Sequence, residues 1–154
     1  NCFTGGRIAR AAKYIDTDRF LLTYGDGVAD VNIEKLLSFH KSHKKIATVT
    51  GANPPARFGN FELKDNQVTS FLEKKPLSES WINGGFFVFE KDFLKYVTKD
   101  PTCVLEKEPL KNVASDGQLM IYKHKGFWQC MDTIREHQQL EELWKSNAPW
   151  KVWK

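Results

Sequence analysis

Long hydrophobic runs, paired cysteines and a strong charge excess are all missing from this sequence of 154 residues. No window approaches the roughly 18 consecutive apolar residues of a membrane span, and the first residues lack the zones of a signal peptide. We therefore expect a soluble, cytoplasmic protein without a membrane partner. The three cysteines, Cys2, Cys103 and Cys130, lie far apart, which is typical of reduced thiols and not of a disulfide framework.

The charge balance also argues against a nucleic-acid partner. The 23 Lys and Arg residues exceed the 19 Asp and Glu residues by a net charge of +4, and they are scattered in short clusters. This thin positive balance fits small anionic ligands better. With 41% apolar and 13% aromatic residues, the composition excludes disorder and predicts one globular domain, residues 1–154. Because the sequence begins without Met, we expect it to be a fragment.

Strand and helix patterns alternate in the first third of the chain. Residues 20–24 and 46–50 are compact apolar runs that predict buried strands. Between them, Ile33, Leu36, Leu37 and His40 form one helical stripe that either Asp30 or Asn32 caps. This order predicts an α/β crossover and a parallel sheet. Thr4–Arg7 predicts a turn before a short helix.

The rest of the chain adds antiparallel strands and helices. Residues 58–63 and 68–71 flank turn residues and predict a hairpin. Residues 81–89 predict a strand with two glycines, which indicate a β-bulge or the close approach of a ligand or another backbone. Further expected elements are short helices at 93–97 and 109–114, strands at 118–124 and 127–132, and a closing helix from 134 to 144. We thus expect a mixed α/β fold with a mainly parallel, Rossmann-like sheet flanked by helices and a small antiparallel hairpin.

Two carboxylates follow apolar strands. Asp26 lies between Gly25 and Gly27, at the carboxyl end of a strand, where ligands bind in open α/β sheets. A carboxylate there suits Mg²⁺, and the alternative is a turn aspartate that caps the next helix. Asp132 is a second candidate, with the N-cap of the closing helix as its alternative. Together, the two carboxylates could hold one metal ion.

Other polar segments suggest a phosphorylated polyol as ligand. Glu73 and Lys74 pair a hydroxyl acceptor with a phosphate-binding ammonium group, and a solvated charge run is the alternative. Asn83 and Gly84 could present an amide and backbone groups to hydroxyls. His40 and His43 lack a third ligand, so we interpret them as partly exposed helix residues and not as a zinc site.

Seven segments occur in the order found in one enzyme family: Thr4–Ile8, Leu22–Val28, Pro54–Gly59, Trp81–Phe87, Asp116–Leu119, Phe127–Thr133 and Ala148–Trp153. The chain resembles the sugar nucleotidyltransferases from Thr4 to Trp153, and within them most closely the glucose-1-phosphate cytidylyltransferases. The resemblance implies a Mg²⁺-dependent reaction of CTP with glucose 1-phosphate that gives CDP-glucose and pyrophosphate. It also implies residue roles: Asp26 and Asp132 as metal ligands, Lys74 on the sugar phosphate, Glu73, Asn83 and Gly84 on glucose hydroxyls, and Gly5, Gly6, Arg7 and Gly25 at the nucleotide.

The chain departs from the family in one large respect. The family's N-terminal strand and its glycine-rich triphosphate loop have no counterpart here, so we expect a truncated domain with impaired catalysis. A non-catalytic binding module and an oligomerising remnant are the alternatives. A missing strand exposes a sheet edge, so we expect a homo-oligomer. Ala56 and Cys130 stand where the family pattern has Gly and Pro.

Overall fold

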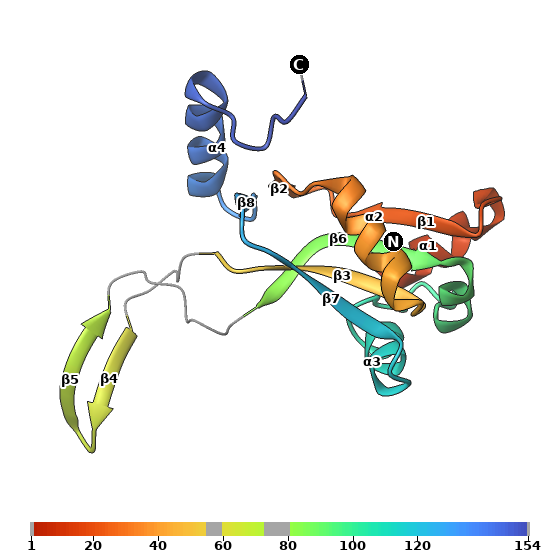
Figure 1. Ribbon diagram of the computed structural model, residues 1–154, viewed down its shortest axis with the longest axis horizontal. Coiled ribbons are helices and arrows are strands. Elements are labelled where there is room, and N and C mark those ends of the chain that lie inside the picture. Colours follow the sequence, from red (N-terminus) through yellow and green to blue (C-terminus); the bar gives the residue numbers. More distant parts are fainter. Residues whose placement is uncertain (1, 55–59, 73–80, 154) are drawn as a thin grey trace. The chain divides into compact units, whose positions relative to one another are not determined.

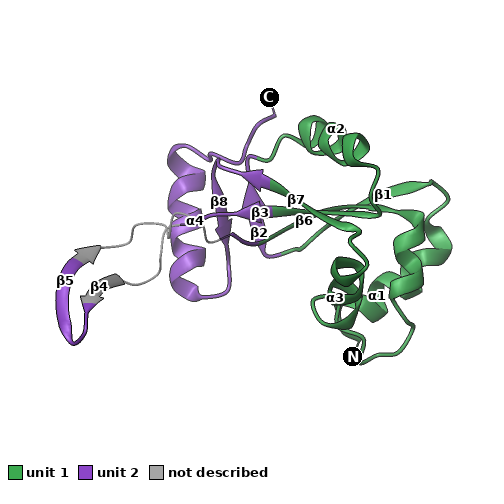
Figure 2. Ribbon diagram, turned by 60° about the horizontal axis from the view of Figure 1, so that its bottom comes forward, with its two compact units in different colours: residues 1–25, 31–50, 83–122 green, residues 26–30, 51–82, 123–154 purple. Residues whose placement is uncertain are grey.

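Two compact units make up the chain (Figure 2). The structure is a computed structural model that describes residues 2–54, 60–72 and 81–153. The first unit comprises residues 1–25, 31–50 and 83–122, and the second comprises residues 26–30, 51–82 and 123–154. Each unit combines segments that are distant in sequence, so each depends on long-range pairing.

A sheet in the strand order β1-β6-β3-β7 is the frame of the first unit (Figure 1). Its strands are β1 (Arg19–Thr23), β3 (Ala47–Ala52), β6 (Ile82–Glu90) and β7 (Leu119–His124). β1 and β6 are antiparallel, with Arg19 opposite Glu90 at one end and Thr23 opposite Phe86 at the other. The sheet is mixed and mainly parallel, which confirms the fold class predicted from the alternation of strands and helices.

Different helices cover the two faces of this sheet (Figure 2). α1 (Thr4–Ala11) and α3 (Glu108–Ser115) lie on one face, and α2 (Ile33–His43) lies on the other. Because successive side chains of a strand point to opposite faces of the sheet, β3 contributes side chains to both faces. Ala47 belongs to the apolar core, whereas Thr48 contacts His40 of α2.

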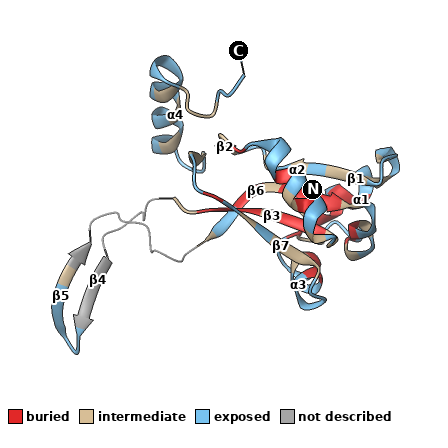
Figure 3. Ribbon diagram, viewed as in Figure 1, coloured by how far each residue is buried: buried red, intermediate tan, exposed pale blue. Residues whose placement is uncertain are grey.

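The core lies on the face that α1 and α3 cover, and Figure 3 shows the buried residues gathered in this unit. Phe89 stacks on Phe93 with ring centroids 3.8 Å apart, and on Phe87 at 5.4 Å. Each such ring contributes about 2 to 3 kcal/mol by leaving water. The buried cluster consists of Ile8, Ala9, Ala47, Phe87, Phe89, Phe93, Val97, Leu105 and Val113.

The ends of α2 explain where this helix begins and stops. Of the two predicted caps, Asn32 is the one used, and its side chain accepts a hydrogen bond from the Lys35 N–H at 2.9 Å. Lys44 ends the helix in the left-handed conformation, with φ of 56°. The predicted stripe is only partly correct, because Ile33 is 40% exposed. The prediction that His40 is partly exposed is wrong: its exposed fraction is 1%.

The predicted turn at Thr4–Arg7 is the first part of α1, so that prediction was wrong. Gly5 and Gly6 serve close packing here. A Cβ on Gly5 would lie 2.6 Å from the Cys103 sulfur, and one on Gly6 would lie 2.6 Å from the Asp100 carbonyl oxygen. The two glycines therefore let α1 approach the loop before α3. A short 3-10 turn, η1 (Ala12–Tyr14), follows α1, and another, η2 (Lys91–Tyr96), stands where the sequence predicted a helix.

The second unit contains two small antiparallel pairs and a helix. β2 (Gly27–Ala29) pairs with β8 (Trp128–Cys130), and α4 (Ile134–Ser146) follows β8. β4 (Asn60–Lys64) and β5 (Gln67–Leu72) form the predicted hairpin, whose turn holds Asp65 at φ of 52°. The last segment folds back on α4, since Trp150 stacks on Trp144 and Phe127. No helix among the described residues has the length and apolar character needed to span a membrane.

Candidate functional site

A network of side chains just after β1 joins four segments of the first unit that are distant in sequence. The Tyr24 hydroxyl donates a hydrogen bond to Glu106 and accepts one from Asn83 Nδ2 at 3.0 Å. The other Glu106 oxygen accepts a hydrogen bond from Thr4 Oγ1 at 2.9 Å, and Thr4 accepts one from the Leu105 N–H. One carboxylate thus connects the start of α1, the end of β1 and the start of β6.

Asn83, predicted to bind sugar hydroxyls, is held by this network. Its Oδ1 accepts a hydrogen bond from the Gly85 N–H at 2.9 Å, while its Nδ2 donates to Tyr24. An amide has two donor hydrogens and two lone pairs, so one of each is left for a ligand. The side chain is exposed, and its orientation is fixed before any ligand binds.

Gly85 of β6 makes room for a side chain from the end of β1. Gly85 has φ of 77°, and a Cβ there would lie 2.8 Å from the Tyr24 ring. The Tyr24 N–H also donates to the Gly85 carbonyl at 2.9 Å. The sequence predicted the close approach of a ligand or another backbone, whereas the group that lies against Gly85 is the side chain of Tyr24. Gly84 is buried beside it.

The second unit brings Asp26 and Asp132 to the same end of the β2–β8 pair. Gly27 lies opposite Cys130 in the register, and the Met131 N–H donates to the Asp26 carbonyl at 2.8 Å. Asp132 is the next residue beyond this hydrogen bond. Both aspartates are exposed. Asp26 and Asp132 are more than 100 positions apart in the sequence, yet one backbone hydrogen bond links their segments. Asp26 accepts this hydrogen bond, and Asp132 directly follows Met131, which donates it.

Neither aspartate has the structural role that was its alternative. Asn32 caps α2, so Asp26 does not. Thr133 caps α4, in a capping box in which the Glu136 carboxylate accepts hydrogen bonds from the Thr133 and Asp132 N–H groups, both at 2.9 Å. The alternative interpretation of Asp132 as N-cap is therefore wrong by one residue. Thr133 is the cap, because Glu136 lies three residues after it, as a capping box requires.

Three side chains with possible metal-ligand atoms gather around Asp132. Cys130, Asp132 and Glu136 each place one ligand atom within 4.8 Å of the others. The Cys130 thiol donates to Glu136 at 3.6 Å, and Glu136 is already engaged in capping. Asp26 is not part of this group, and its link to the segment of Asp132 is the backbone hydrogen bond from Met131. Carboxylate oxygens are the hard donors that Mg²⁺ prefers, so an ion shared by Asp26 and Asp132 stays a prediction.

The other predicted site residues are placed as follows. Gly5, Gly6 and Arg7 lie in α1, where Arg7 Nε donates to the Cys2 carbonyl at 2.7 Å. Gly25 follows β1, and a Cβ there would meet no atom of the described chain within 4 Å. Glu73 and Lys74 lie outside the described residues.

Sequence reasoning missed Glu106 and Glu136. Glu136 could have been found, because Thr133 and Glu136 have the spacing of a capping box. Glu106 has no local signal, since only the packing of α1 and β6 against its segment brings it to Tyr24.

The sequence of the chain matches a known family. The family model described as "Nucleotidyl transferase" matches residues 4–140. The chain belongs to this nucleotidyl transferase family. It is 49% identical over 152 residues to glucose-1-phosphate cytidylyltransferase from Salmonella typhimurium, an alignment that covers 97% of this chain and 59% of that protein. It is also 32% identical over 132 residues to the mannose-1-phosphate guanylyltransferase catalytic subunit beta from Xenopus tropicalis, covering 81% of this chain and 36% of that one.

Solved structures show the same fold. HddC from Yersinia pseudotuberculosis superimposes with a TM-score of 0.68 at 21% identity, over 92% of this chain and 62% of that one. A second structure of HddC, complexed with GMP-PN, gives a TM-score of 0.65 at 19% identity. The chain spans about three fifths of the length of the cytidylyltransferase that it matches. The resemblance on which the expectations rested is confirmed at the level of the family and the fold.

Proposed function

We propose that this chain carries the sugar-phosphate part of an enzyme that transfers a cytidylyl group from CTP to α-D-glucose 1-phosphate. The observation that supports this most is that Asp26 and Asp132, which match the family's metal carboxylates, lie at one end of the β2–β8 pair. The identity of 49% to a cytidylyltransferase supports the choice of base and sugar.

In the proposed reaction, a phosphate oxygen of glucose 1-phosphate attacks the α-phosphorus of CTP. The bond from that phosphorus to the bridging oxygen breaks, pyrophosphate leaves with its electron pair, and CDP-glucose forms. Little covalent chemistry falls to the protein, so its contribution is positioning and neutralisation of charge. Asp26 and Asp132 would hold Mg²⁺, which supplies positive charge to the phosphates when bound.

The chain's own side chains would orient the sugar phosphate. We assign Lys74 to the phosphate of the sugar, with Glu73, Asn83 and Gly84 on the glucose hydroxyls. The structure supports one part of this assignment directly, because Tyr24 and Gly85 fix the Asn83 amide while leaving one donor and one acceptor unused. Gly5, Gly6, Arg7 and Gly25 are assigned to the nucleotide.

Several exposed apolar side chains of the second unit support the proposal that the protein self-associates. They are Met131, Ile134, Trp144, Val152 and Trp153, each at least 42% exposed. Sedimentation of the chain at two concentrations tests this, and we expect a species heavier than the monomer. A monomer at both concentrations would contradict it.

Titration calorimetry with CDP-glucose tests the proposed site. We expect binding in Mg²⁺ that is at least about tenfold weaker in EDTA and equally weakened by Asp26→Asn, because the carboxylate charge holds the metal. Asp65→Asn is the matched control, since it removes the same charge at a hairpin turn where Asn tolerates the left-handed backbone.

Metal-independent binding that survives Asp26→Asn would overturn the assigned metal ligands while keeping a binding module. No binding under either condition would overturn the proposed function of this chain. Release of pyrophosphate from CTP and glucose 1-phosphate distinguishes an active chain from a binding module.

A further inference from the structure

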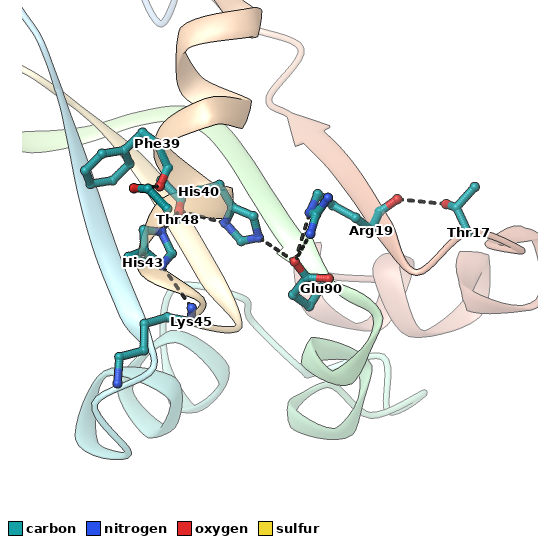
Figure 4. Close-up of polar contacts among 9 residues, drawn as sticks. Thr17, Arg19, Phe39, His40, His43, Lys45, Thr48 and Glu90 are labelled. Atoms are coloured by element: carbon teal, nitrogen blue, oxygen red, sulfur yellow. Dashed lines mark hydrogen bonds and ion pairs between the residues drawn. The ribbon is translucent and has the colours of Figure 1, made fainter.

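A partly buried polar network lies at the opposite end of β1 from Tyr24 (Figure 4). His40 Nε2 lies 3.0 Å from Glu90 Oε1, and His40 Nδ1 lies 2.8 Å from Thr48 Oγ1. Arg19 contacts the same Glu90 oxygen through Nη2 and, at 2.8 Å, through Nε. His43 Nε2 lies 2.7 Å from the Thr48 hydroxyl. The network thus connects α2, β1, β3 and β6.

The donors and acceptors of this network have one consistent assignment. The Lys45 N–H can only donate, so His43 Nδ1 accepts its hydrogen bond and the His43 proton is on Nε2. His43 then donates to Thr48, Thr48 donates to His40 Nδ1, and His40 Nε2 donates to Glu90. Both imidazoles are neutral in this arrangement. Burial, the largest influence on each, lowers the pKa of His40 and of His43, which favours the same neutral state.

Arg19, His40 and Glu90 line a pocket of about 590 Å³ whose rim carries lysines. They are Lys41 and Lys44 at the end of α2, Lys45 in the loop after it, and Lys91 at the start of η2. Within the described chain, no ion pair or hydrogen bond engages any of these four ammonium groups. The pocket has the size of a site for a small molecule.

The charges around the pocket leave an excess of positive charge. Of its acidic residues, Glu90 is paired with Arg19, and Asp92 is paired with Lys95 at 2.6 Å. Asp18 and the carboxyl end of α2, which carries about half a negative charge, oppose the lysines. The positive charge of the four unpaired ammonium groups exceeds the negative charge of Asp18 and the helix end, so the pocket attracts anions.

We propose that this pocket binds a second phosphate-bearing ligand, a di- or triphosphate, at a place separate from the proposed substrate site. Lysine ammonium groups bind phosphate as point charges, and several around one pocket match a ligand with several phosphoryl groups. Arg19 and Thr23 are the two ends of β1, roughly 13 Å apart at the usual rise per residue. The pocket is therefore distinct from the network of Tyr24, Asn83 and Glu106, and its test does not depend on the cytidylyltransferase proposal.

Titration with inorganic tripolyphosphate in EDTA, followed through the imidazole NMR signals, tests this site. We expect saturable shifts of the His40 and His43 signals, because both rings are part of the pocket's network, and none of His137, which is exposed on α4. The absence of metal keeps the proposed Mg²⁺-dependent site out of the measurement.

Charge variants give the second readout. The triple variant Lys41→Gln, Lys44→Asn and Lys45→Gln removes the pocket's charge, with Asn chosen at 44 because that residue is left-handed. Its matched control carries Lys35→Gln, Lys99→Gln and Lys111→Gln, three exposed lysines elsewhere on the chain. We expect the pocket triple to weaken binding at least about tenfold and the control at most about threefold.

Equal weakening by both triples would overturn the proposal, since it would indicate nonspecific charge attraction. So would shifts of His40 and His43 that do not saturate with millimolar tripolyphosphate. Lys91→Gln, an exposed single change at the start of η2, repeats the test if the triple variant does not fold.

Discussion

At the scale of single residues, Tyr24 organises the site in the first unit. Its hydroxyl joins Glu106 to Asn83, and its ring fills the space above Gly85. The ring also packs 5.5 Å from Phe87 of the core. One side chain therefore couples the orientation of a proposed sugar-binding amide to the packing of the sheet.

Replacing Gly85 by Ala should destabilise the protein by about 2 kcal/mol, because a left-handed backbone with a Cβ is strained and the Tyr24 ring must move. Urea unfolding measures this. Gly25→Ala is the matched control, and with open space around it its cost should stay below about 0.5 kcal/mol. Equal costs for the two variants would show that the ring does not constrain position 85.

Tyr24→Phe keeps the ring and removes the hydroxyl. Stability should fall by at most about 1 kcal/mol, because water reaches the exposed Glu106 and Asn83 side chains. Affinity for CDP-glucose should fall about threefold to tenfold, since the Asn83 amide is no longer fixed. Tyr122→Phe is the control, with a ring that packs against Phe39 at a tilt, with centroids 5.6 Å apart. Unchanged affinity for CDP-glucose in Tyr24→Phe would show that the Tyr24 hydroxyl does not position Asn83 for the ligand.

At the scale of elements, α4 depends on its N-terminal cap more than on burial. None of its described residues is buried, and Thr133 and Glu136 form a reciprocal capping box. The same box fixes the backbone N–H of Asp132 through Glu136. The start of this helix therefore positions a proposed metal ligand.

Thr133→Ala should reduce the free energy of unfolding by about 1 kcal/mol, because the cap is lost. Thr133→Ser should retain most of the cap's stabilisation, because Ser keeps the oxygen that accepts a hydrogen bond from the Glu136 N–H. Urea unfolding followed by circular dichroism at the helix band compares the two. If Ser and Ala cost the same, the methyl group of Thr133 matters and the cap does not.

Local patterns predicted the elements well and the contacts between them poorly. Helical spacing gave α2 and α4, and turn residues gave the β4–β5 hairpin, because these signals lie within one segment. The short β2 was missed, since its three residues have no pattern of their own. The burial of His40 could not be predicted, because its partners Thr48 and Glu90 are on other elements.

At the scale of the whole molecule, the network under α2 links folding to pH. Burial, the largest influence on each, lowers the pKa of both His40 and His43, whereas the hydrogen bond and charge of Glu90 act in the opposite direction on His40. Arg19 and His40 hold the pKa of Glu90 below its usual value, although burial alone would raise it. The charged groups that influence the two rings are Arg19 of β1, Glu90 of β6 and Lys45 of the loop after α2.

The free energy of unfolding should therefore fall as pH decreases below the usual histidine pKa of 6.5. In this range His40 and His43 bind protons in the unfolded chain but stay neutral in the folded protein, because folding lowers their pKa values. The loss continues down to the lowered pKa values. Glu90 adds a further loss below its usual pKa of 4.5, since the folded state favours its charged form.

Urea midpoints between neutral and acidic pH measure this slope. His43→Gln should flatten it, and His137→Gln, on the exposed surface of α4, should leave it unchanged. A slope that His43→Gln does not alter would place the acid sensitivity elsewhere.

For the whole molecule, we propose that Asp26 and Asp132 hold one divalent cation together with a sugar nucleotide. Paramagnetic broadening of backbone NMR signals by Mn²⁺ in the presence of CDP-glucose tests this most directly. We expect the broadening to centre on Gly27 and Met131, which lie beside the two aspartates, and we expect Asp132→Asn to abolish it. Broadening centred on other acidic residues, or unchanged in Asp132→Asn, would show that these two aspartates do not hold the cation.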